Sequence, residues 1–296
     1  MADHLYICGD CPRNCNAQRT FYTSAGFCKA GLLPVINRTA PHFWEEPCIS
    51  GKNGSGTVFF GGCNLRCVYC QNSEISRSPK GKIYSVTELA DKIKYLELTG
   101  VHNINLVTPT HYTYAIVEAL KKYKPSVPVV YNCGGYESVK TLKRLEDFVD
   151  IYLTDFKYIT SASAKRYSKA PDYPETVKAA LKEMVDQTGA PVFDNYGMLQ
   201  KGVIVRHLVL PSNTDESISI IDYLDREYGN KILFSLMHQY YPAGDAEEYP
   251  EINRRLTKHE YQKVLNRLLE SSLDGFVQDS DSAKATYTPN FDTDSN

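Results

Sequence analysis

The stretch GGCNLRCVYCQN, residues 61–72, places three cysteines in the order C-x-x-x-C-x-x-C directly after the apolar run TVFF. These cysteines are Cys63, Cys67 and Cys70. Free thiols this densely spaced are prone to oxidation, whereas a bound metal ionises and neutralises them. The spacing therefore favours a metal cluster on this loop, with buried or disulfide-paired cysteines as the alternative.

The number of cysteines distinguishes the metals that this loop could bind. Structural zinc takes four closed ligands, and the loop offers three. A four-iron cluster on three cysteine thiolates leaves one iron open to a small molecule. We therefore expect a [4Fe-4S] cluster rather than zinc.

With Tyr69 just before its last cysteine, the loop resembles the signature of the radical S-adenosylmethionine (SAM) superfamily. The resemblance implies that Cys63, Cys67 and Cys70 hold the cluster and that its open iron binds the amino and carboxylate groups of SAM. It also implies reductive cleavage of SAM to a 5′-deoxyadenosyl radical, which abstracts a hydrogen atom from the substrate. An electron donor such as flavodoxin or ferredoxin is then an expected partner.

Composition excludes several classes of protein. The 296 residues are 42% hydrophobic and 23% charged, as is ordinary for a soluble globular protein. A net charge of -2 provides no basic field for a phosphate backbone, so we expect no nucleic-acid partner. The N-terminal stretch MADHLYICGDC lacks the pattern of a signal peptide, so we expect a cytoplasmic protein without a membrane span. Cysteines in a cytoplasmic protein indicate metal binding or catalysis.

A second group of cysteines lies near the N-terminus, in a Cys-rich segment and connection that we assign to residues 1–56. Its members are Cys8, Cys11, Cys15 and Cys28. Four thiols in so short a segment suit zinc or a second iron-sulfur cluster, and plain buried cysteines are the alternative. Residues 31–56 are expected to form an irregular connection, in which Cys48 either ligates metal or acts as a small buried hydrophobe.

From residue 57 to 275, apolar strand-like runs alternate with helical patterns, which predicts βα units. The expected strands are 57–61, 103–108, 127–132, 151–156, 202–210 and 232–240. The expected helices are 86–98, 112–123, 138–147, 173–188, 215–228 and 257–271. Thr257 and Glu260 are positioned for a capping box, and Thr214 or Asp215 for a helix cap.

Six such units are fewer than the eight of a closed barrel, so we predict an α/β fold with a partial (β/α)6 TIM-type barrel. This is also the fold that the resemblance implies. Residues 276–296, rich in Asp, Ser and Thr, are predicted to be a disordered tail.

Polar residues follow the predicted strands at the barrel end where reactive groups collect. SAM presents a carboxylate, an amine, a sulfonium and hydroxyls, and these groups need cationic and polar contacts. The candidate SAM contacts are Thr108, Asn132, Asp155, Lys157 and Arg206. A local ion pair of Asp155 with Lys157 is the alternative for those two residues.

Three histidines near the strand ends, His111, His207 and His238, are candidates for proton transfer or for lining a substrate pocket. For each of them we favour a hydrogen-bonded structural role.

Asp155-Phe156-Lys157 resembles the Asp-Leu-Lys at the fourth strand of the pyruvate formate-lyase activating enzyme branch, which implies that Lys157 contacts SAM. Two positions depart from this branch. Asn132-Cys133-Gly134-Gly135 stands where that activase has Asp-Thr-Asn-Gly, so a charged ligand of its cation site is lost. Thr108-Pro109-Thr110 stands where many members of the superfamily carry Gly-Gly-Glu. The resemblance extends from residue 8 to about residue 265 and includes the segments HFWEEPCISG, NINLVTPTHY and RHLVLP.

Three functions compete at this point. The first is an activase-like oxidoreductase that places a radical on a glycyl radical enzyme as its partner. The second is a radical SAM enzyme acting on a small molecule or a peptide residue. The third, from another class, is a non-catalytic metal-binding scaffold.

Overall fold

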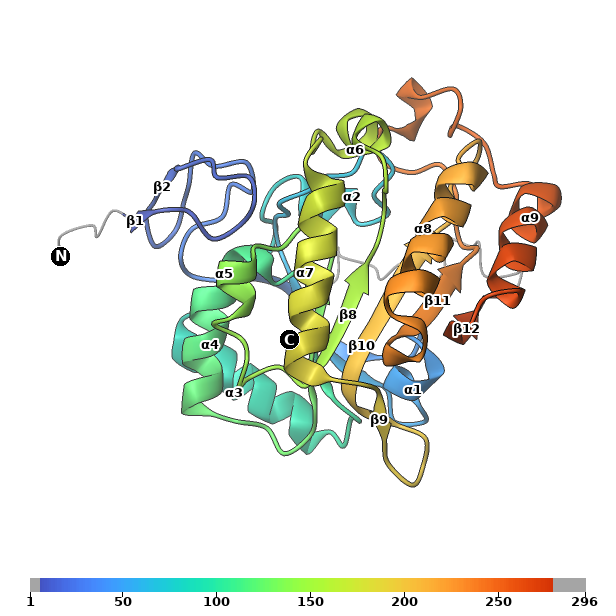
Figure 1. Ribbon diagram of the computed structural model, residues 1–296. Helices are drawn as coiled ribbons and strands as arrows, with labels where there is room; N and C mark the ends of the chain where they lie inside the picture. Colours follow the sequence, from blue (N-terminus) through green and yellow to red (C-terminus); the bar gives the residue numbers. More distant parts are fainter. Residues whose placement is uncertain (1–5, 279–296) are drawn as a thin grey trace.

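The protein, seen in a computed structural model that describes residues 6–278, is built on one large sheet that is covered on its outside by helices (Figure 1). The strands of this sheet follow the spatial order β12-β11-β10-β8-β7-β6-β4-β3-β5, and β9 pairs with β10. Their bounds are β3 Val35–His42, β4 Ser55–Phe60, β5 Lys82–Ile83, β6 Ile104–Val107, β7 Val129–Cys133, β8 Ile151–Asp155, β9 Val192–Phe193, β10 Leu199–Leu208, β11 Leu233–Met237 and β12 Asp274–Val277.

The strands from β4 to β12 each lie parallel to their neighbours in this order. The two edge strands, β5 and β12, lie at opposite ends of the order, so the sheet curls without closing. The predicted partial barrel is therefore confirmed, with β4, β6, β7, β8, β10 and β11 as the six expected strands.

Two assignments at the ends of the barrel were wrong. β12 reaches Val277, so the start of the predicted tail belongs to the sheet; its four residues are mostly exposed and give no apolar pattern. The rest of that tail, residues 279–296, lies outside the described residues. β3 lies within the predicted irregular connection and pairs antiparallel with β4. Only its first two side chains are buried, so it shows no alternation to recognise.

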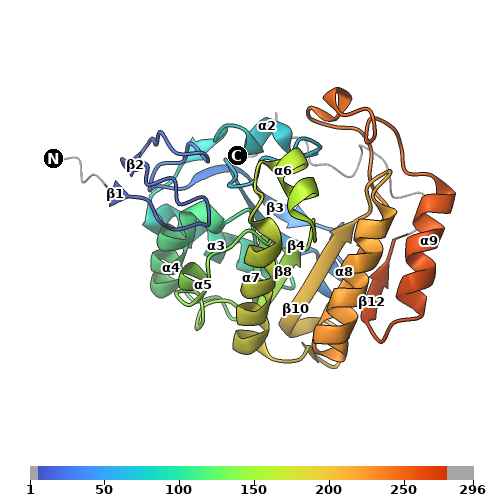
Figure 2. The ribbon, with the colours of Figure 1, turned by 45° about the horizontal axis from the view of Figure 1, so that its top comes forward.

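Helices cover the outer face of the sheet, as Figure 2 shows. The helices of the described chain are α1 Pro47–Ser50, α2 Ser73–Ser76, α3 Val86–Leu98, α4 Thr113–Lys122, α5 Val139–Leu142, α6 Ser161–Ser168, α7 Tyr173–Thr188, α8 Thr214–Glu227 and α9 Lys258–Leu269, of which α1 and α2 do not belong to the outer layer. Short 3-10 turns occupy Thr110–Tyr112, Gly229–Lys231 and Ala246–Glu248. Among the described residues, no helix combines the length and the apolar character that crossing a bilayer requires.

The helix predictions succeeded where the helical pattern of apolar residues continues over many residues. α3 and α7 have the predicted bounds, and Thr257 and Glu260 form the predicted capping box of α9. The predicted cap of α8 was wrong, because Asn213 holds that position without a side-chain hydrogen bond. α5 is shorter than predicted, and α6 was not predicted.

The inside of the barrel is layered from apolar to polar. Ile49 and Cys48 of α1 pack at the amino ends of the strands with inward-facing aliphatic residues, namely Val130, Ile151, Leu153, Leu199, Ile204 and Leu233. Cys48 is therefore a small buried hydrophobe. Because side chains alternate along a strand, the next inward positions of β7, β8, β10 and β11 are Asn132, Asp155, Arg206 and Ser235. A polar layer thus lies between the apolar plug and the carboxyl ends of the strands.

A two-stranded ribbon, β1 Tyr6–Ile7 with β2 Gln18–Arg19, belongs to the N-terminal cysteine segment. This segment lies beside the barrel, on the side of α4 and α5 (Figure 1). Ser138, at the start of α5, donates a hydrogen bond to the Asp10 carbonyl at 3.1 Å. The segment is therefore docked on the barrel by specific polar contacts.

Candidate functional site

A cavity of about 580 Å³ opens at the carboxyl ends of the parallel strands. Its wall includes the three cysteines of the loop that follows β4, which are Cys63, Cys67 and Cys70. The five candidate cofactor contacts also line it: Thr108, Asn132, Asp155, Lys157 and Arg206. The structure thus brings together in one cavity residues that are far apart in the sequence.

Each loop sulfur accepts a hydrogen bond. The Leu65 amide donates to Cys63 Sγ at 3.3 Å, the Ser168 hydroxyl to Cys67 Sγ at 3.1 Å, and the Ser76 hydroxyl to Cys70 Sγ at 3.6 Å. Tyr158 links the Ser168 hydroxyl to Tyr69, since its own hydroxyl lies 2.8 Å from both. Donors aimed at sulfur stabilise thiolate ligands, so the donor set suits metal-bound cysteines.

Burial also affects the protonation of these cysteines. Burial raises the pKa of Cys63 to about 12, so without a metal its sulfur stays protonated at neutral pH. Residues 6–278 contain no group of three or more His, Cys, Asp or Glu side chains arranged around a single metal ion. The three cysteines line one cavity, as residues that share one cluster must.

Arg13 fastens the cysteine loop to the rest of the molecule. Its guanidinium donates to the Asn64 carbonyl at 2.8 Å and to the Ser168 carbonyl at 2.7 Å, and it lies over the Phe27 ring at 4.0 Å. These contacts join the N-terminal segment, the loop and the end of α6. Arg13 therefore supports the site without itself lining the cavity.

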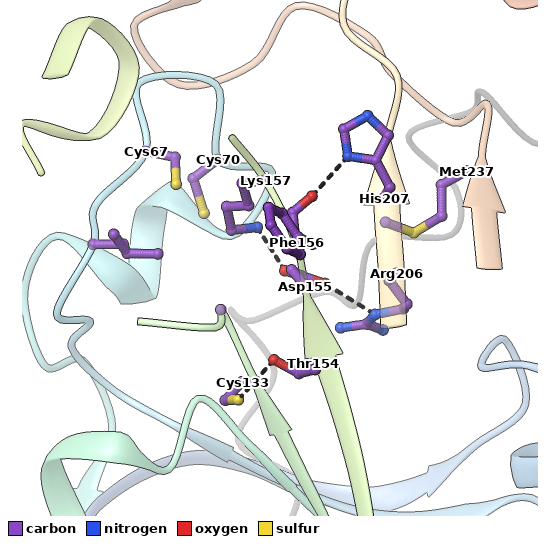
Figure 3. Close-up of polar contacts among 12 residues, drawn as sticks. Cys67, Cys70, Cys133, Thr154, Asp155, Phe156, Lys157, Arg206, His207 and Met237 are labelled. Carbon is purple, nitrogen blue, oxygen red and sulfur yellow. Dashed lines mark hydrogen bonds and ion pairs between the residues drawn. The ribbon is translucent and has the colours of Figure 1, made fainter. Parts of the chain in front are cut away.

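Asp155 stands between two cations at the end of β8 (Figure 3). Lys157 Nζ donates to Asp155 Oδ2 at 2.5 Å, and Arg206 Nε donates to Asp155 Oδ1 at 3.0 Å. Figure 3 also shows Lys157 beside Cys67 and Cys70. The predicted local ion pair of Asp155 with Lys157 is present, and it lies within the cavity wall.

The charges in this group set one another's protonation. Burial alone would lower the pKa of Lys157, but the charge of Asp155, with smaller contributions from Cys67 and Cys70, raises it well above its ordinary value. Burial would raise the pKa of Asp155, and the charges of Lys157 and Arg206 outweigh it and lower that pKa. Lys157 is therefore a fixed cation facing the cysteines at neutral pH.

Sequence reasoning missed two acidic residues of the cavity, Glu45 and Glu46, which follow β3. Arg206 Nη1 donates to Glu45 Oε2 at 3.1 Å, while the side-chain amides of Asn105 and Asn132 each donate to Glu45 Oε1 at 3.2 Å. Burial raises the pKa of both glutamates, although Arg206 counteracts it. In the sequence these residues appear only as two acids before a proline, which does not indicate a site. Their burial depends on how β3 and α1 pack in the barrel, and the sequence pattern does not show this.

Thr108 and Cys133 differ in their relation to the cavity. Thr108 has φ +58°, which is rare for a β-branched residue, and its amide donates to the Asn132 carbonyl at 2.8 Å. Such strain is characteristic of functional turns. Cys133 also lines the cavity, but its thiol is buried and directed to the Thr154 hydroxyl at 3.4 Å.

None of the three candidate histidines lines this cavity. His111 Nε2 lies 2.8 Å from the Gly61 carbonyl, where it holds the base of the cysteine loop. His207 bridges the Phe156 carbonyl, 2.7 Å away, and the Ser217 hydroxyl, 2.8 Å away. His238 packs against the edge of the Tyr261 ring. His111 and His207 thus have the hydrogen-bonded structural role favoured from the sequence. His238 is held by ring packing, and its buried Nδ1 has no hydrogen-bond partner among the described residues.

Comparison with known proteins agrees with this geometry. The profile of the radical SAM superfamily matches residues 57–224. The chain belongs to the radical SAM superfamily. Membership implies a [4Fe-4S] cluster and SAM as cofactors, and the residues of the cavity fit both groups.

Two proteins of Methanocaldococcus jannaschii resemble this radical SAM protein. Uncharacterized protein MJ0674 is 32% identical, with 90% of this chain and 75% of the relative covered. Uncharacterized protein MJ0808 is 24% identical, with 84% of this chain and 76% of the relative covered.

Among solved structures, methylornithine synthase (PylB) superposes with a TM-score of 0.51 at 12% identity, covering 75% of this chain and 63% of that protein. SuiB of Streptococcus suis, bound to S-adenosylmethionine, gives a TM-score of 0.50 at 13% identity, with 74% and 48% covered. The radical SAM protein described here thus spans about half to two thirds of these solved chains. At such identities the likeness concerns the fold.

The second cysteine group of this radical SAM protein lies apart from the cavity. Cys8, Cys11 and Cys28 are buried and Cys15 is exposed. Burial raises the pKa of Cys11 to about 12, and the nearby Cys28 and Cys8 add to the shift. The described residues hold no set of side chains arranged around a single ion, so the structure does not show which of the two expected metal groups, zinc or a second iron-sulfur cluster, these cysteines bind.

Proposed function

We propose that this protein cleaves SAM reductively at a [4Fe-4S] cluster held by Cys63, Cys67 and Cys70. The observation that carries the proposal is the position of Lys157, a half-buried cation of the cavity wall beside Cys67 and Cys70. A fixed cation next to a thiolate cradle suits a cofactor that brings a carboxylate to the metal.

When bound, the reduced cluster supplies the electron that cleaves SAM to methionine and a 5′-deoxyadenosyl radical, which takes a hydrogen atom from the substrate. The chain's own residues bind and orient. Lys157 pairs with the SAM carboxylate, while the Thr108 backbone and Asn132 offer polar contacts at neighbouring strand ends. The buried wall excludes water from a reactive radical. A one-electron donor such as flavodoxin or ferredoxin provides the reducing equivalent.

Two substrate classes are compatible with this radical, and one is favoured. An activase of the pyruvate formate-lyase type acts on a glycine of a partner protein, and glycine has no charged side chain. Charged residues line the cavity here, among them the buried Glu46 and the half-buried Glu45 and Arg206. Buried charges specify polar ligand groups, so we favour a small molecule or a peptide side chain over a glycyl radical enzyme.

One assay tests the proposed function against the scaffold alternative. The anaerobically reconstituted protein is incubated with SAM and dithionite, and 5′-deoxyadenosine is quantified by chromatography. A radical SAM enzyme forms 5′-deoxyadenosine beyond the level of a Cys63→Ala, Cys67→Ala, Cys70→Ala control. Equal product from both proteins refutes the proposal and leaves a metal-binding scaffold.

The N-terminal cysteines are proposed to hold a separate structural metal group. Three of the four thiols are buried beside one another in a segment with little apolar periodicity, and a metal would supply folding energy there. We propose an iron-sulfur cluster rather than zinc at these cysteines.

A further inference from the structure

One carboxylate in the cavity wall lacks the partners that its neighbours have. Glu45 accepts hydrogen bonds at both carboxylate oxygens, and Asp155 is paired with two cations. Glu46 is only 8% exposed, and its carboxylate accepts from the Ser235 hydroxyl. Its second oxygen, Oε2, is buried and has no hydrogen-bond donor within residues 6–278. Glu46 is thus the incompletely satisfied acid of the cavity.

An unpaired buried carboxylate oxygen is costly, and a ligand that supplies a donor removes that cost. Leaving a buried polar group without a partner costs about 1–3 kcal/mol, and more when the group is charged. Gln278, the residue after β12, also lines the cavity and has a buried Oε1 without a donor among the described residues. Gln278 Oε1 accepts hydrogen bonds, and Glu46 Oε2 does so when the carboxyl group is ionised, so the cavity fits a ligand that donates there and whose positive charge keeps Glu46 ionised.

The position of Glu46 separates it from the proposed cofactor contacts. Its partner Ser235 pairs with Arg206 in the sheet and lies two residues before Met237, the last residue of β11. Because inward-facing side chains recur every second residue, Ser235 lies one layer deeper in the barrel than Met237. Lys157 and the cysteines lie beyond the strand ends. A group bound at Glu46 is therefore deeper in the cavity than the cluster.

The number of unpaired carboxylate oxygens on Glu46 indicates which donor group of a ligand fits there. A guanidinium prefers two carboxylate oxygens in a fork, whereas an ammonium is a compact charge that one oxygen can pair with. Glu46 offers one oxygen. The described residues also hold no set of ligands for a single metal ion. We infer that Glu46 Oε2 binds the protonated primary amine of the substrate, an inference that rests on the proposed radical SAM function.

Two sources supply this amine, a free alkylamine and the lysine side chain of a peptide. Binding is measured by calorimetry on anaerobic, SAM-loaded protein with the cluster oxidised, so that no turnover occurs. The probes are n-pentylamine, its neutral counterpart n-pentanol, and Nα-acetyl-lysine-N-methylamide. We expect saturable binding of at least one amine and none of the alcohol. Tighter binding of the alkylamine indicates a free amine as substrate, and tighter binding of the lysine derivative indicates a peptide.

Glu46→Gln is the decisive variant, because it keeps the shape of the side chain and removes its charge. Loss of a charged hydrogen bond predicts amine binding weaker by roughly ten- to a hundredfold. Glu270→Gln, which removes the same charge from an exposed position after α9, should bind the amine as the unmodified protein does. SAM affinity, measured on the same samples, should be unchanged in Glu46→Gln, and this also reports that the variant is folded.

Several outcomes would overturn the inference. These are the absence of amine binding by the unmodified protein, equal amine affinity in Glu46→Gln, or equal binding of amine and alcohol. Loss of SAM affinity in both Glu46→Gln and the charge-retaining Glu46→Asp would assign Glu46 to the cofactor instead. The binding assay needs no reductant, so failure of SAM cleavage and failure of amine binding remain separate results.

Discussion

The Ser168 hydroxyl donates a hydrogen bond to the Cys67 sulfur at 3.1 Å, across 101 residues of sequence. Hydrogen bonds to the sulfur ligands stabilise the more negative, reduced form of a cluster and so raise its reduction potential. Ser168→Ala should therefore lower the potential. A differential contribution of about 1 kcal/mol corresponds to roughly 40 mV for a one-electron couple.

This shift is measured by a redox titration followed by electron paramagnetic resonance. Ser76→Ala serves as the matched control, since its hydroxyl lies farther from Cys70 Sγ, at 3.6 Å, and its removal should shift the potential less. An unchanged potential in Ser168→Ala would show that the hydroxyl does not act on a cluster ligand.

Replacing Cys63, Cys67 or Cys70 singly by Ala should abolish SAM cleavage and lower the iron content while the protein stays folded. The three cysteines lie on a loop at the mouth of the barrel, whereas the sheet is held by its own apolar layers. Iron analysis checks the iron content, circular dichroism checks that the protein is folded, and 5′-deoxyadenosine formation checks SAM cleavage. Cys48→Ala, in the apolar plug, should keep both iron and cleavage; full turnover in any of the loop variants would refute the cluster assignment.

Lys157→Ala should weaken SAM binding and leave the visible absorption of the cluster intact. Loss of a hydrogen bond to a charged group is worth about 1.5–3 kcal/mol, which predicts roughly a ten- to a hundredfold weaker affinity. Equilibrium binding of SAM to the oxidised protein measures it. Lys165→Ala, at an exposed position of α6, controls for loss of a positive charge. Unchanged affinity would mean that Lys157 serves only as the ion-pair partner of Asp155.

The sequence indicated the cluster loop, the partial barrel and the cations at the strand ends, because each depends on local spacing or on the strand-helix alternation. The sequence did not indicate that Glu45 and Glu46, which directly precede Pro47, belong to the cavity. Their role arises from burial, and that burial is created by β3 pairing with β4 and by Ile49 packing into the barrel. A strand whose side chains are mostly half-exposed leaves no periodic signal, so the acids that follow it could not be placed.

The stability of the protein should depend on pH through His207. Burial lowers the pKa of His207 to about 4, and its ring bridges Phe156 and Ser217 in the neutral form. Between pH 6.5 and about 4 the unfolded state holds this proton and the folded state does not. The free energy of unfolding therefore falls with falling pH across this window, by up to about 1.4 kcal/mol per pH unit from this residue.

Urea unfolding at several pH values measures this dependence. In His207→Gln the slope of the free energy of unfolding against pH should be smaller across this window, by the equivalent of about one proton taken up on unfolding. This holds even if the variant is less stable at neutral pH. His259→Gln, at an exposed position near the start of α9, is the matched control and should leave the slope unchanged. An equal slope in His207→Gln and in the unmodified protein would show that His207 takes up its proton alike in both states.

The N-terminal cysteines should retain metal when the cluster loop can bind none. Cys8, Cys11 and Cys28 are buried beside the barrel, and none of the four cysteines of this segment lines the cavity. A Cys63→Ala, Cys67→Ala, Cys70→Ala protein should therefore still contain iron and acid-labile sulfide after anaerobic reconstitution, without binding SAM at that site. Metal and sulfide analysis measures this.

Further replacement of Cys11 and Cys28 by Ala should remove the residual iron and expose the segment to protease, because the metal supplies its folding energy. One zinc per chain would instead support zinc, the other metal that the sequence allows at these cysteines, and a metal-free protein would show that these thiols are unligated.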